Sequence, residues 1–408
     1  MIRGNQGIQE AFAQLQVNSV LDEPPADGND TPTMPNGIPK VYVIDGLLDL
    51  TLSVPIHAAF DSRLAACQCI KAYFFSHQVI RKHFLRRAIE GHASGADETA
   101  NVLTTLLQPL DLHVSGDPYR HWFAAVIMFH LIFEESTAKS LAMSVTEGDA
   151  SNGEEVVTCI QSLTANLIIG IEKNADERVL VAYLMLLSGW LFEDPDAVND
   201  FLGEGSNLNS LVQAALQSSG DSTIVPGLCA LLLGIVYEFS TKDSPVPRAT
   251  IHPILVSQLG RDQYIDRMTK LRAHPLLRDF EVLPQKLGST SIGGLPEVYF
   301  DRSFVDFVKD NYSRFLRAID RDPGMEIPVI ANGVQKGISR EMVDSLRSQL
   351  EEKEKALQKA EEDAISFQRQ LEQEQAEHRR NKETAVVELA RTKHINDSLK
   401  QHYEEDAK

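Results

Sequence analysis

Apolar positions follow helical periods from Val41 to about Glu281, and the alternation typical of strands is hard to find. Four apolar stretches in this region align without gaps, and each closes on a phenylalanine: Leu64–Phe74, Phe123–Phe133, Ala182–Phe192 and Cys229–Phe239. A helix that is apolar on nearly all sides must be packed between neighbours, so a near-regular series of them indicates stacked helical repeats. We predict an all-α fold with an armadillo or HEAT-like α-solenoid head. An ordinary globular helical domain is the alternative.

From Ser339 to Glu405 the pattern changes to a heptad repeat on a highly charged stretch that contains neither glycine nor proline. Its apolar seam consists of Val343, Leu346, Leu350, Leu357, Ala360, Ala364, Phe367 and Leu371. One chain cannot bury so narrow a seam on itself, so we predict a long coiled-coil helix that pairs as a parallel homodimer. Polar residues enter the core positions beyond Leu371, which makes that half a weak zipper or a landing site for another helix. A single solvated helix with pairs such as Glu351–Lys355 is the alternative.

The segments around the repeats give local predictions. Residues Gly7–Leu21 are expected to form a short helix, and the acidic, proline-rich residues 22–40 a mobile loop. Prolines follow Asp117 and Asp194 at expected helix starts, where a proline costs no hydrogen bond. Asp61 and Asp301 are expected to be N-caps.

The end of the head is also expected to be helical. One face of an amphipathic helix there carries Phe304, Phe307, Val308, Phe315 and Leu316. A stretch rich in proline and glycine follows, and we expect it to be a linker. The predicted organisation is a head over residues 1–321, a linker over 322–338 and a coiled coil over 339–408.

Composition narrows the classes of function. A net charge of −19 and a pI near 5.1 argue against a nucleic-acid-binding protein, which needs clustered Lys and Arg. The four cysteines lie in apolar runs without metal-ligand or disulfide spacing, as expected of buried thiols in a cytosolic protein. Neither a signal peptide nor an apolar stretch long enough to span a membrane is present, so membrane association is expected to be peripheral and mediated by partners.

Candidate chemistry is sparse. The sequence contains no Walker loop and no GxSxG, HExxH or GxGxxG motif, and its histidines lack metal-ligand spacing. We therefore predict no catalytic residues, no metal and no cofactor, and we expect His130 to be a satisfied core histidine. Trp122 and Trp190 are expected to pack in the core.

One basic cluster stands out in this acidic chain. Arg81, Lys82, Arg86 and Arg87, with His83 between them, lie on a single expected helix. Such a cluster could dock an acidic partner segment or a phosphoinositide headgroup. We favour the plainer interpretation of a solvated helix end, because basic residues near a helix C-terminus interact favourably with the helix dipole.

The residues after Gly227 resemble a known family. The runs GLCALLLGIVYEF and PRATIHPILVSQLGRDQYIDRMTKLRAHPLLRDFE are similar to the end of the globular head in the general vesicular transport factor family, the Uso-type Golgi tethers. YFDRSFVDFVKDNYSRFLRAI at 299–319 resembles the closing head helix of that family. The resemblance is specific from Pro226 to Ile319 and looser from Gly4 to Phe201. Set beside that family, the chain is expected to lack the N-terminal head repeats and the remainder of the tail.

The resemblance implies a dimeric tether that holds vesicles from the endoplasmic reticulum near Golgi membranes before fusion. It also implies recruitment by a Rab-type GTPase, contacts with SNAREs and golgins, and a cytoplasmic protein peripheral on these membranes. A solenoid on a rod fits such a scaffold, since dimerisation turns weak contacts into avidity. A soluble armadillo-type adaptor for peptide or cargo motifs is the alternative, and an enzyme ranks third.

Overall fold

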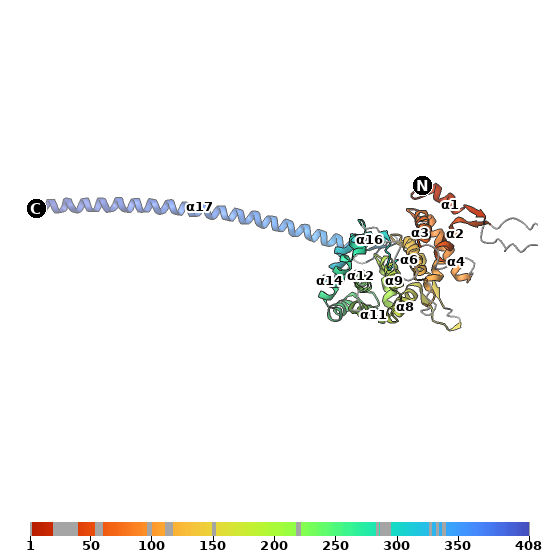
Figure 1. The fold of residues 1–408 in the computed structure, drawn as a ribbon. Coiled ribbons are helices and arrows are strands. Elements are labelled where there is room, and N and C mark those ends of the chain that lie inside the picture. Colours follow the sequence, from red (N-terminus) through yellow and green to blue (C-terminus); the bar gives the residue numbers. More distant parts are fainter. Residues whose placement is uncertain are drawn as a thin grey trace, which may run out of the picture. The chain divides into compact units, whose positions relative to one another are not determined.

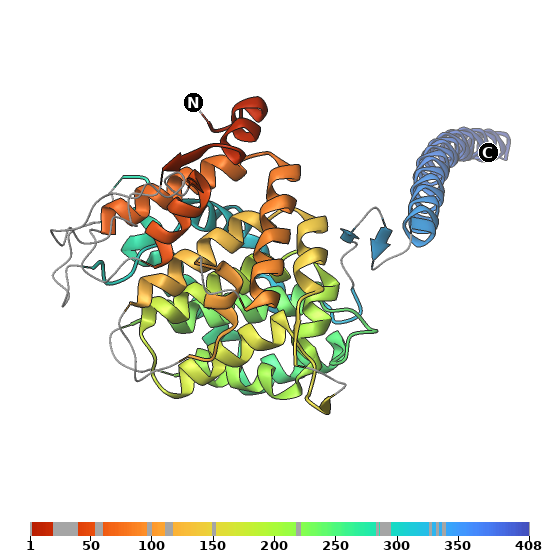
Figure 2. The same ribbon diagram turned by 90° about the vertical axis from the view of Figure 1, so that its right-hand side faces the viewer.

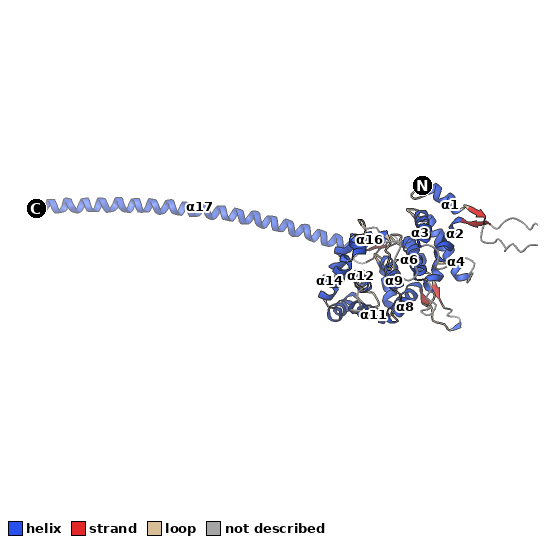
Figure 3. Ribbon diagram, in the orientation of Figure 1, coloured by secondary structure: helices blue, strands red, loops and turns tan. Residues whose placement is uncertain are grey.

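A computed structural model describes the protein over residues 2–18, 40–53, 60–95, 100–110, 117–148, 152–217, 222–282, 285, 295–325, 329–331, 334–336 and 340–407. Over 329–331, 334–336, 340–352 and 354 it describes the backbone only. Two units are distinguished, Met1–Gly337 and Ile338–Lys408. Helices dominate both units, and the strands in the described residues are three short antiparallel pairs (Figure 3).

The elements of the first half of the head are α1 (Gln6–Ala13), β1 (Gln16–Asn18), β2 (Lys40–Tyr42), α2 (Val43–Leu52), α3 (Phe60–Phe74), α4 (Gln78–Ser94), α5 (Val102–Leu107), α6 (Pro118–Ile132), α7 (Ser136–Met143), β3 (Thr146–Glu147), β4 (Val157–Thr158) and α8 (Cys159–Glu172). The second half contains α9 (Glu177–Leu191), α10 (Pro195–Gly203), α11 (Gly205–Leu216), α12 (Ile224–Phe239), α13 (Arg248–Ile254), a π-helical turn (Leu255–Leu259), α14 (Arg261–Ala273), α15 (Pro275–Arg278), α16 (Arg302–Leu316), a 3-10 turn (Ala318–Asp320), β5 (Val329–Ala331) and β6 (Val334–Lys336).

Four helices form the centre of the head. Helix α9 lies between α6 and α12, and α3 packs on the other side of α6, so the four apolar stretches of the sequence become neighbours in the same order (Figures 1 and 2). Every residue of α9 from Val179 to Leu191 is buried, as is nearly all of α12. The prediction of stacked helices that are apolar on nearly all sides is confirmed for α6, α9 and α12, whereas α3 is buried on one face and exposes Asp61 and Gln68 on the other. Trp122 and Trp190 are both buried in this core.

A repeated turn joins each of three central helices to the next one. After α3, α6 and α9 the backbone turns through a left-handed residue, respectively Ser76, Glu134 and Glu193, with φ of 53°, 56° and 55°. The following residue is the N-cap of α4, α7 or α10, and the side chains of His77 and Asp194 accept hydrogen bonds from backbone amides of those helices. The repeat thus reverses the chain within three residues at the expense of an unfavourable φ.

The position of this turn shows that the gap-free alignment of the repeats is wrong by one residue in the first repeat. Phe133 and Phe192 directly precede their left-handed residues, but the equivalent position after α3 is Phe75, whereas Phe74 is the last helical residue. The first repeat is therefore shifted by one residue. Apolar patterns could not reveal the shift, because both positions are phenylalanine.

Asp301 caps α16 as expected, and Asp117 and Asp194 lie at helix starts as expected, where each is also the N-cap. Asp61 is not an N-cap, because α3 already begins at Phe60 and Asp61 lies in its first turn. The helix expected over Gly7–Leu21 ends at Ala13. The chain then enters β1, whose Val17 pairs with Val41 of β2, so tertiary pairing outweighed a short helical pattern. The predicted loop at 22–40 lies outside the described residues, apart from Lys40.

The second unit is the single helix α17, from Arg340 to Asp406, with 67 residues. At about 1.5 Å per residue it is roughly 100 Å long. The described side chains along it are exposed.

Candidate functional site

One segment connects the helices of the head. Residues 295–321, which we call the crossing segment, contain α16, and their rings pack on the phenylalanines at the ends of the central helices. Phe307 contacts both Phe133 and Phe192, with ring centroids 5.4 and 5.0 Å apart. Phe304 contacts Phe129 of α6, and Phe315 contacts Phe192. The amphipathic face predicted for α16 is thus confirmed, and it covers the Phe-ended side of the repeats.

Asp301 fixes the start of the crossing segment. Its carboxylate, with a side chain only 3% exposed, is paired with the Lys71 ammonium of α3 and accepts a hydrogen bond from Nε2 of His130 of α6 at 2.9 Å. Burial alone would raise the pKa of Asp301, but His130 and Lys71 outweigh burial and hold that pKa far below its usual range. Burial lowers the pKa of His130, so this ring is a neutral donor at pH 7. His130 is a satisfied core histidine, as predicted.

Glu238 fixes the other end. This carboxylate of α12 is fully buried and pairs with Arg314 at 2.8 Å and with Arg321 at 3.0 Å. Arg314 also reaches Glu193, just after α9, at 3.1 Å. The hydroxyl of Tyr264 donates to the Phe315 carbonyl at 2.6 Å. Ion pairs and hydrogen bonds therefore tie the crossing segment to α3, α6, α12 and the end of α9.

The buried cysteines of the head are not activated as nucleophiles. Cys67 lies near the Lys71–Asp301 pair, but burial raises the pKa of its thiol to about 12, the opposite of what a nucleophilic cysteine needs. Cys159 and Cys229 are also buried, whereas Cys69 is exposed, which corrects the expectation that all four thiols are buried. Among the described residues no group of His, Cys, Asp and Glu could hold a metal ion.

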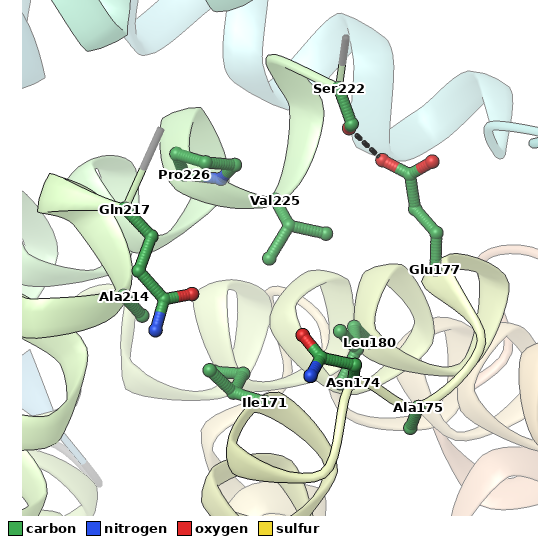
Figure 4. Close-up of a pocket in the computed structure, with 10 residues that line it drawn as sticks. All are labelled: Ile171, Asn174, Ala175, Glu177, Leu180, Ala214, Gln217, Ser222, Val225 and Pro226. Carbon is green, nitrogen blue, oxygen red and sulfur yellow. Dashed lines mark hydrogen bonds between the residues drawn. The ribbon is translucent and has the colours of Figure 1, made fainter. Parts of the chain in front are cut away.

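A recess of about 160 Å³ lies between the ends of α8, α9, α11 and α12 (Figure 4). Apolar side chains such as Ile171, Leu180 and Val225 form much of its wall. Among the described lining residues the one carboxylate is Glu177, which accepts a hydrogen bond from the Ser222 hydroxyl. The described residues of the recess therefore provide no pair of acid and base that could do chemistry.

The predicted basic cluster lies on one helix, α4, but its side chains diverge. Arg81 points inward and donates to the carbonyl oxygens of Phe74 and Phe133 at 3.2 and 3.1 Å. Nη2 of Arg87 lies 2.9 and 3.0 Å from the two carboxylate oxygens of Asp45. Lys82 is half-buried, and Arg86 and His83 are exposed. The four cations therefore do not form one patch. They lie between the fourth and the tenth of the 17 residues of α4 and not in its last turn, so the favoured interpretation of charges near a helix C-terminus is wrong.

The structure describes the side chains of five of the eight predicted seam residues. Leu357, Phe367 and Leu371 are 65%, 68% and 55% exposed on the single chain, and Ala360 and Ala364 are exposed as well. The side chains of Val343, Leu346 and Leu350 lie outside the described residues.

Other apolar side chains are exposed on α17 outside the seam of the first half, including Val386, Val387 and Leu389. The predicted heptad frame did not include them, because it kept one register along the whole helix. Their closeness in the sequence was the signal that could have identified a second apolar patch.

A family model matches most of the chain. It is described as "Uso1 / p115 like vesicle tethering protein, head region" and matches residues 5–319. The chain belongs to this family. The matched range includes all four central helices and nearly all of the crossing segment. The resemblance noted in the sequence, which was specific only after Pro226, therefore extends over the whole head.

Relatives of the chain are named for their roles in transport. It is 27% identical over 375 residues to "Intracellular protein transport protein USO1" of Saccharomyces cerevisiae, covering 80% of this chain and 20% of the relative. It is 24% identical over 322 residues to human "General vesicular transport factor p115", covering 78% of this chain and 30% of the relative. A crystal structure of Uso1 matches with a TM-score of 0.66 and 26% identity over 79% of this chain and 48% of that one. These matches confirm the all-α solenoid head.

No helix among the described residues is both long enough and apolar enough to cross a membrane.

Proposed function

We propose that this chain is a vesicle-tethering factor that links transport vesicles derived from the endoplasmic reticulum to Golgi membranes before fusion. The observation that carries the proposal is the family match over residues 5–319, together with relatives named for intracellular and vesicular transport. The chain spans only 20% to 30% of the length of these relatives, so activities of their remaining parts are not assigned to it. The proposed role is a binding scaffold and not an enzyme.

Two physical features support a scaffold. The head offers a broad surface of stacked helices, and α17 bears an exposed apolar seam that a second copy would cover. We propose a head over 1–321, a linker over 322–338 and a coiled coil over 339–408 that makes the homodimer. Two heads on one stalk raise the effective concentration of each for its target, so weak contacts suffice to hold a vesicle.

The homodimer can be tested with Leu357→Asp combined with Leu371→Asp. Because both side chains lie on the seam, we expect the double variant to be monomeric by light scattering while the head stays folded. Val387→Asp changes an equally exposed apolar residue off the seam and should leave the dimer intact. A double variant that remains a dimer would exclude this seam as the interface.

The tethering role can be tested by clustering of membranes. Vesicles budded from endoplasmic reticulum and purified Golgi membranes should sediment together when the wild-type chain is added, and a Rab-type GTPase in its GTP state should increase the effect. The monomeric variant should bind one membrane and cluster neither. Wild-type chain that fails to cluster membranes in either nucleotide state would refute the proposal. SNAREs and golgins are the further proposed partners, and they are the membrane components to deplete next.

One observation argues against the peptide-adaptor alternative. A peptide adaptor of the armadillo type needs an open face across its repeats. The Phe-ended face of the repeats is covered by α16 of the same chain, through Phe304, Phe307 and Phe315.

A further inference from the structure

A basic cavity opens where α3, α6 and the start of α16 meet. It measures about 310 Å³ and is lined by residues from the N-terminal segment and all three helices. Phe75 and Phe133, which occupy equivalent positions in neighbouring repeats, contribute apolar surface to its wall. The cavity therefore lies at a junction that the repeated turns themselves create.

Four cationic side chains line this cavity, namely Arg3, Lys71, Arg81 and Arg302. Among the described lining residues the one carboxylate is Glu134. A local excess of positive charge is notable in a chain whose net charge is −19. The excess persists after Asp301, just behind the wall, has neutralised Lys71.

Two of these cations have little to hold them in place. Arg3 lies over the ring of Phe75, with its guanidinium carbon 4.1 Å from the ring centroid, and no ion pair links it to the described residues. Arg302 is paired only at 3.8 Å, with the exposed Asp306. Arg81 is different, because its guanidinium is already fixed by the carbonyl oxygens of Phe74 and Phe133. The cavity thus combines one preorganised guanidinium with two at the rim that can turn toward a ligand.

We propose that this cavity binds an acidic side chain of a partner protein, from a segment in which a carboxylate neighbours an aromatic or aliphatic residue. Guanidinium groups form forked hydrogen bonds with carboxylates, and the two phenylalanines provide apolar surface for the neighbouring side chain. A phosphate group offers similar oxygens, but the wall has more apolar surface, from Phe75 and Phe133, than an inositol headgroup can use. The inference rests on the proposed role of the head as a protein-binding scaffold.

The test is binding of a fluorescein-labelled octapeptide of alternating Glu and Phe to the full chain, measured by fluorescence anisotropy. The same peptide with Gln in place of Glu is the ligand control. We expect the acidic peptide to bind at concentrations below about 1 mM and the amide peptide not to bind. Arg3→Glu combined with Arg302→Glu should weaken binding at least about ten-fold, because both charges face the ligand.

A matched pair of charge reversals elsewhere controls for net charge. Arg120→Glu combined with Lys173→Glu changes two exposed cations that lie outside the cavity, and binding should stay within about two-fold of wild type. Unchanged tryptophan fluorescence would show that each variant remains folded. Equal weakening in both double variants, or no binding to the wild-type chain, would overturn the proposal.

Two further arms separate the sources of the anion. Inorganic phosphate, and vesicles containing phosphatidylinositol 4-phosphate, are titrated under the same conditions. If either binds more tightly than the peptide and shows the same dependence on Arg3 and Arg302, the assignment to a carboxylate is wrong. The tethering proposal has a separate test: it is wrong if the wild-type chain does not cluster membranes. That result would not affect the measurement of peptide binding.

Discussion

Replacing Asp301 by asparagine should be among the most damaging single-atom changes that the head can undergo. Asparagine keeps the side-chain oxygen that caps α16 by accepting from the Ser303 amide at 3.0 Å. It replaces Oδ2, the oxygen that pairs with Lys71, by an amide NH2 group, so the negative charge is lost and the Lys71 ammonium, 12% exposed, is left without this counterion. The change therefore isolates the ion pair from the cap.

The expected magnitude follows from that geometry. Breaking a buried ion pair by removing one partner costs about 3–5 kcal/mol, and the slight exposure of Lys71 places the loss near the lower limit, about 3 kcal/mol. Asp301→Ala should lose about 1 kcal/mol more because the N-cap goes as well. Asp306→Asn is the matched control, since its partner Arg302 is exposed and 3.8 Å away, and it should cost less than about 0.5 kcal/mol.

The loss should also depend on pH. The pKa of Asp301 is lower in the folded protein than in the unfolded chain, so its contribution to the free energy of unfolding is complete above the unfolded value, near 4. That contribution is lost as the pH falls below the unfolded pKa and through the folded one. The difference in stability between wild type and Asp301→Asn should thus be constant from about pH 5 to 8 and shrink below about pH 4.

Urea unfolding followed by tryptophan fluorescence measures these values for the head alone. Both tryptophans of the chain, Trp122 and Trp190, are buried in the central helices, and α17 contains none. Lys71→Met should rescue part of the loss, so the double variant with Asp301→Asn should be at least about 1 kcal/mol more stable than additivity predicts. A loss below about 1 kcal/mol for Asp301→Asn, or strict additivity with Lys71→Met, would refute the reasoning.

Two more outcomes are expected. Gly189→Ala would place a methyl group closer to the Phe129 ring than van der Waals contact allows, and it should destabilise the head by about 1–3 kcal/mol in the same urea assay. Gly46→Ala, with open space around it, is the control and should be neutral or stabilising. Equal effects of the two substitutions would contradict the packing of α6 on α9. In the folded protein at pH 8, we expect one thiol per chain, that of Cys69, to react rapidly with a chromogenic disulfide. The other three thiols are buried, and burial raises their pKa, so they should react slowly. Rapid reaction of two or more thiols would contradict this burial.

The sequence predicted the repeats well because three of the four central helices, α6, α9 and α12, are apolar on nearly all sides, a local pattern that survives any arrangement of neighbours. It also predicted the cap at Asp301, whose hydrogen bond from the Ser303 amide reaches only two residues along the chain. The register of the first repeat was missed because Phe74 and Phe75 are identical residues. The hairpin of β1 and β2 was missed because strands of three residues give too little alternation to recognise.

The binding features were harder to predict for a different reason. Asp301 lies 230 residues from Lys71 and 171 from His130, and no local pattern relates such positions. The basic cluster on α4 was visible as a run of letters, yet only the fold shows that Arg81 turns toward α6 while Arg87 turns toward Asp45. The basic cavity is lined by residues from the N-terminal segment, α3, α4, the end of α6 and the start of α16, which only the fold brings together. Charge in a sequence thus identifies candidate residues, whereas the fold decides which of them share a site.

The crossing segment gives this head a property that stacked repeats alone lack. In a simple solenoid each repeat touches only its neighbours, so a force applied at one end is borne first by the last interface. Here the chain that leaves the head toward α17 passes first through residues bonded to α3 by Asp301, to the end of α9 by Arg314, and to α12 by Arg314 and Arg321. A pull transmitted along the chain from α17 therefore enters the head through contacts with several repeats at once. For a protein proposed to hold two membranes together, that distribution of load is a physical reason to close the solenoid with its own last helix.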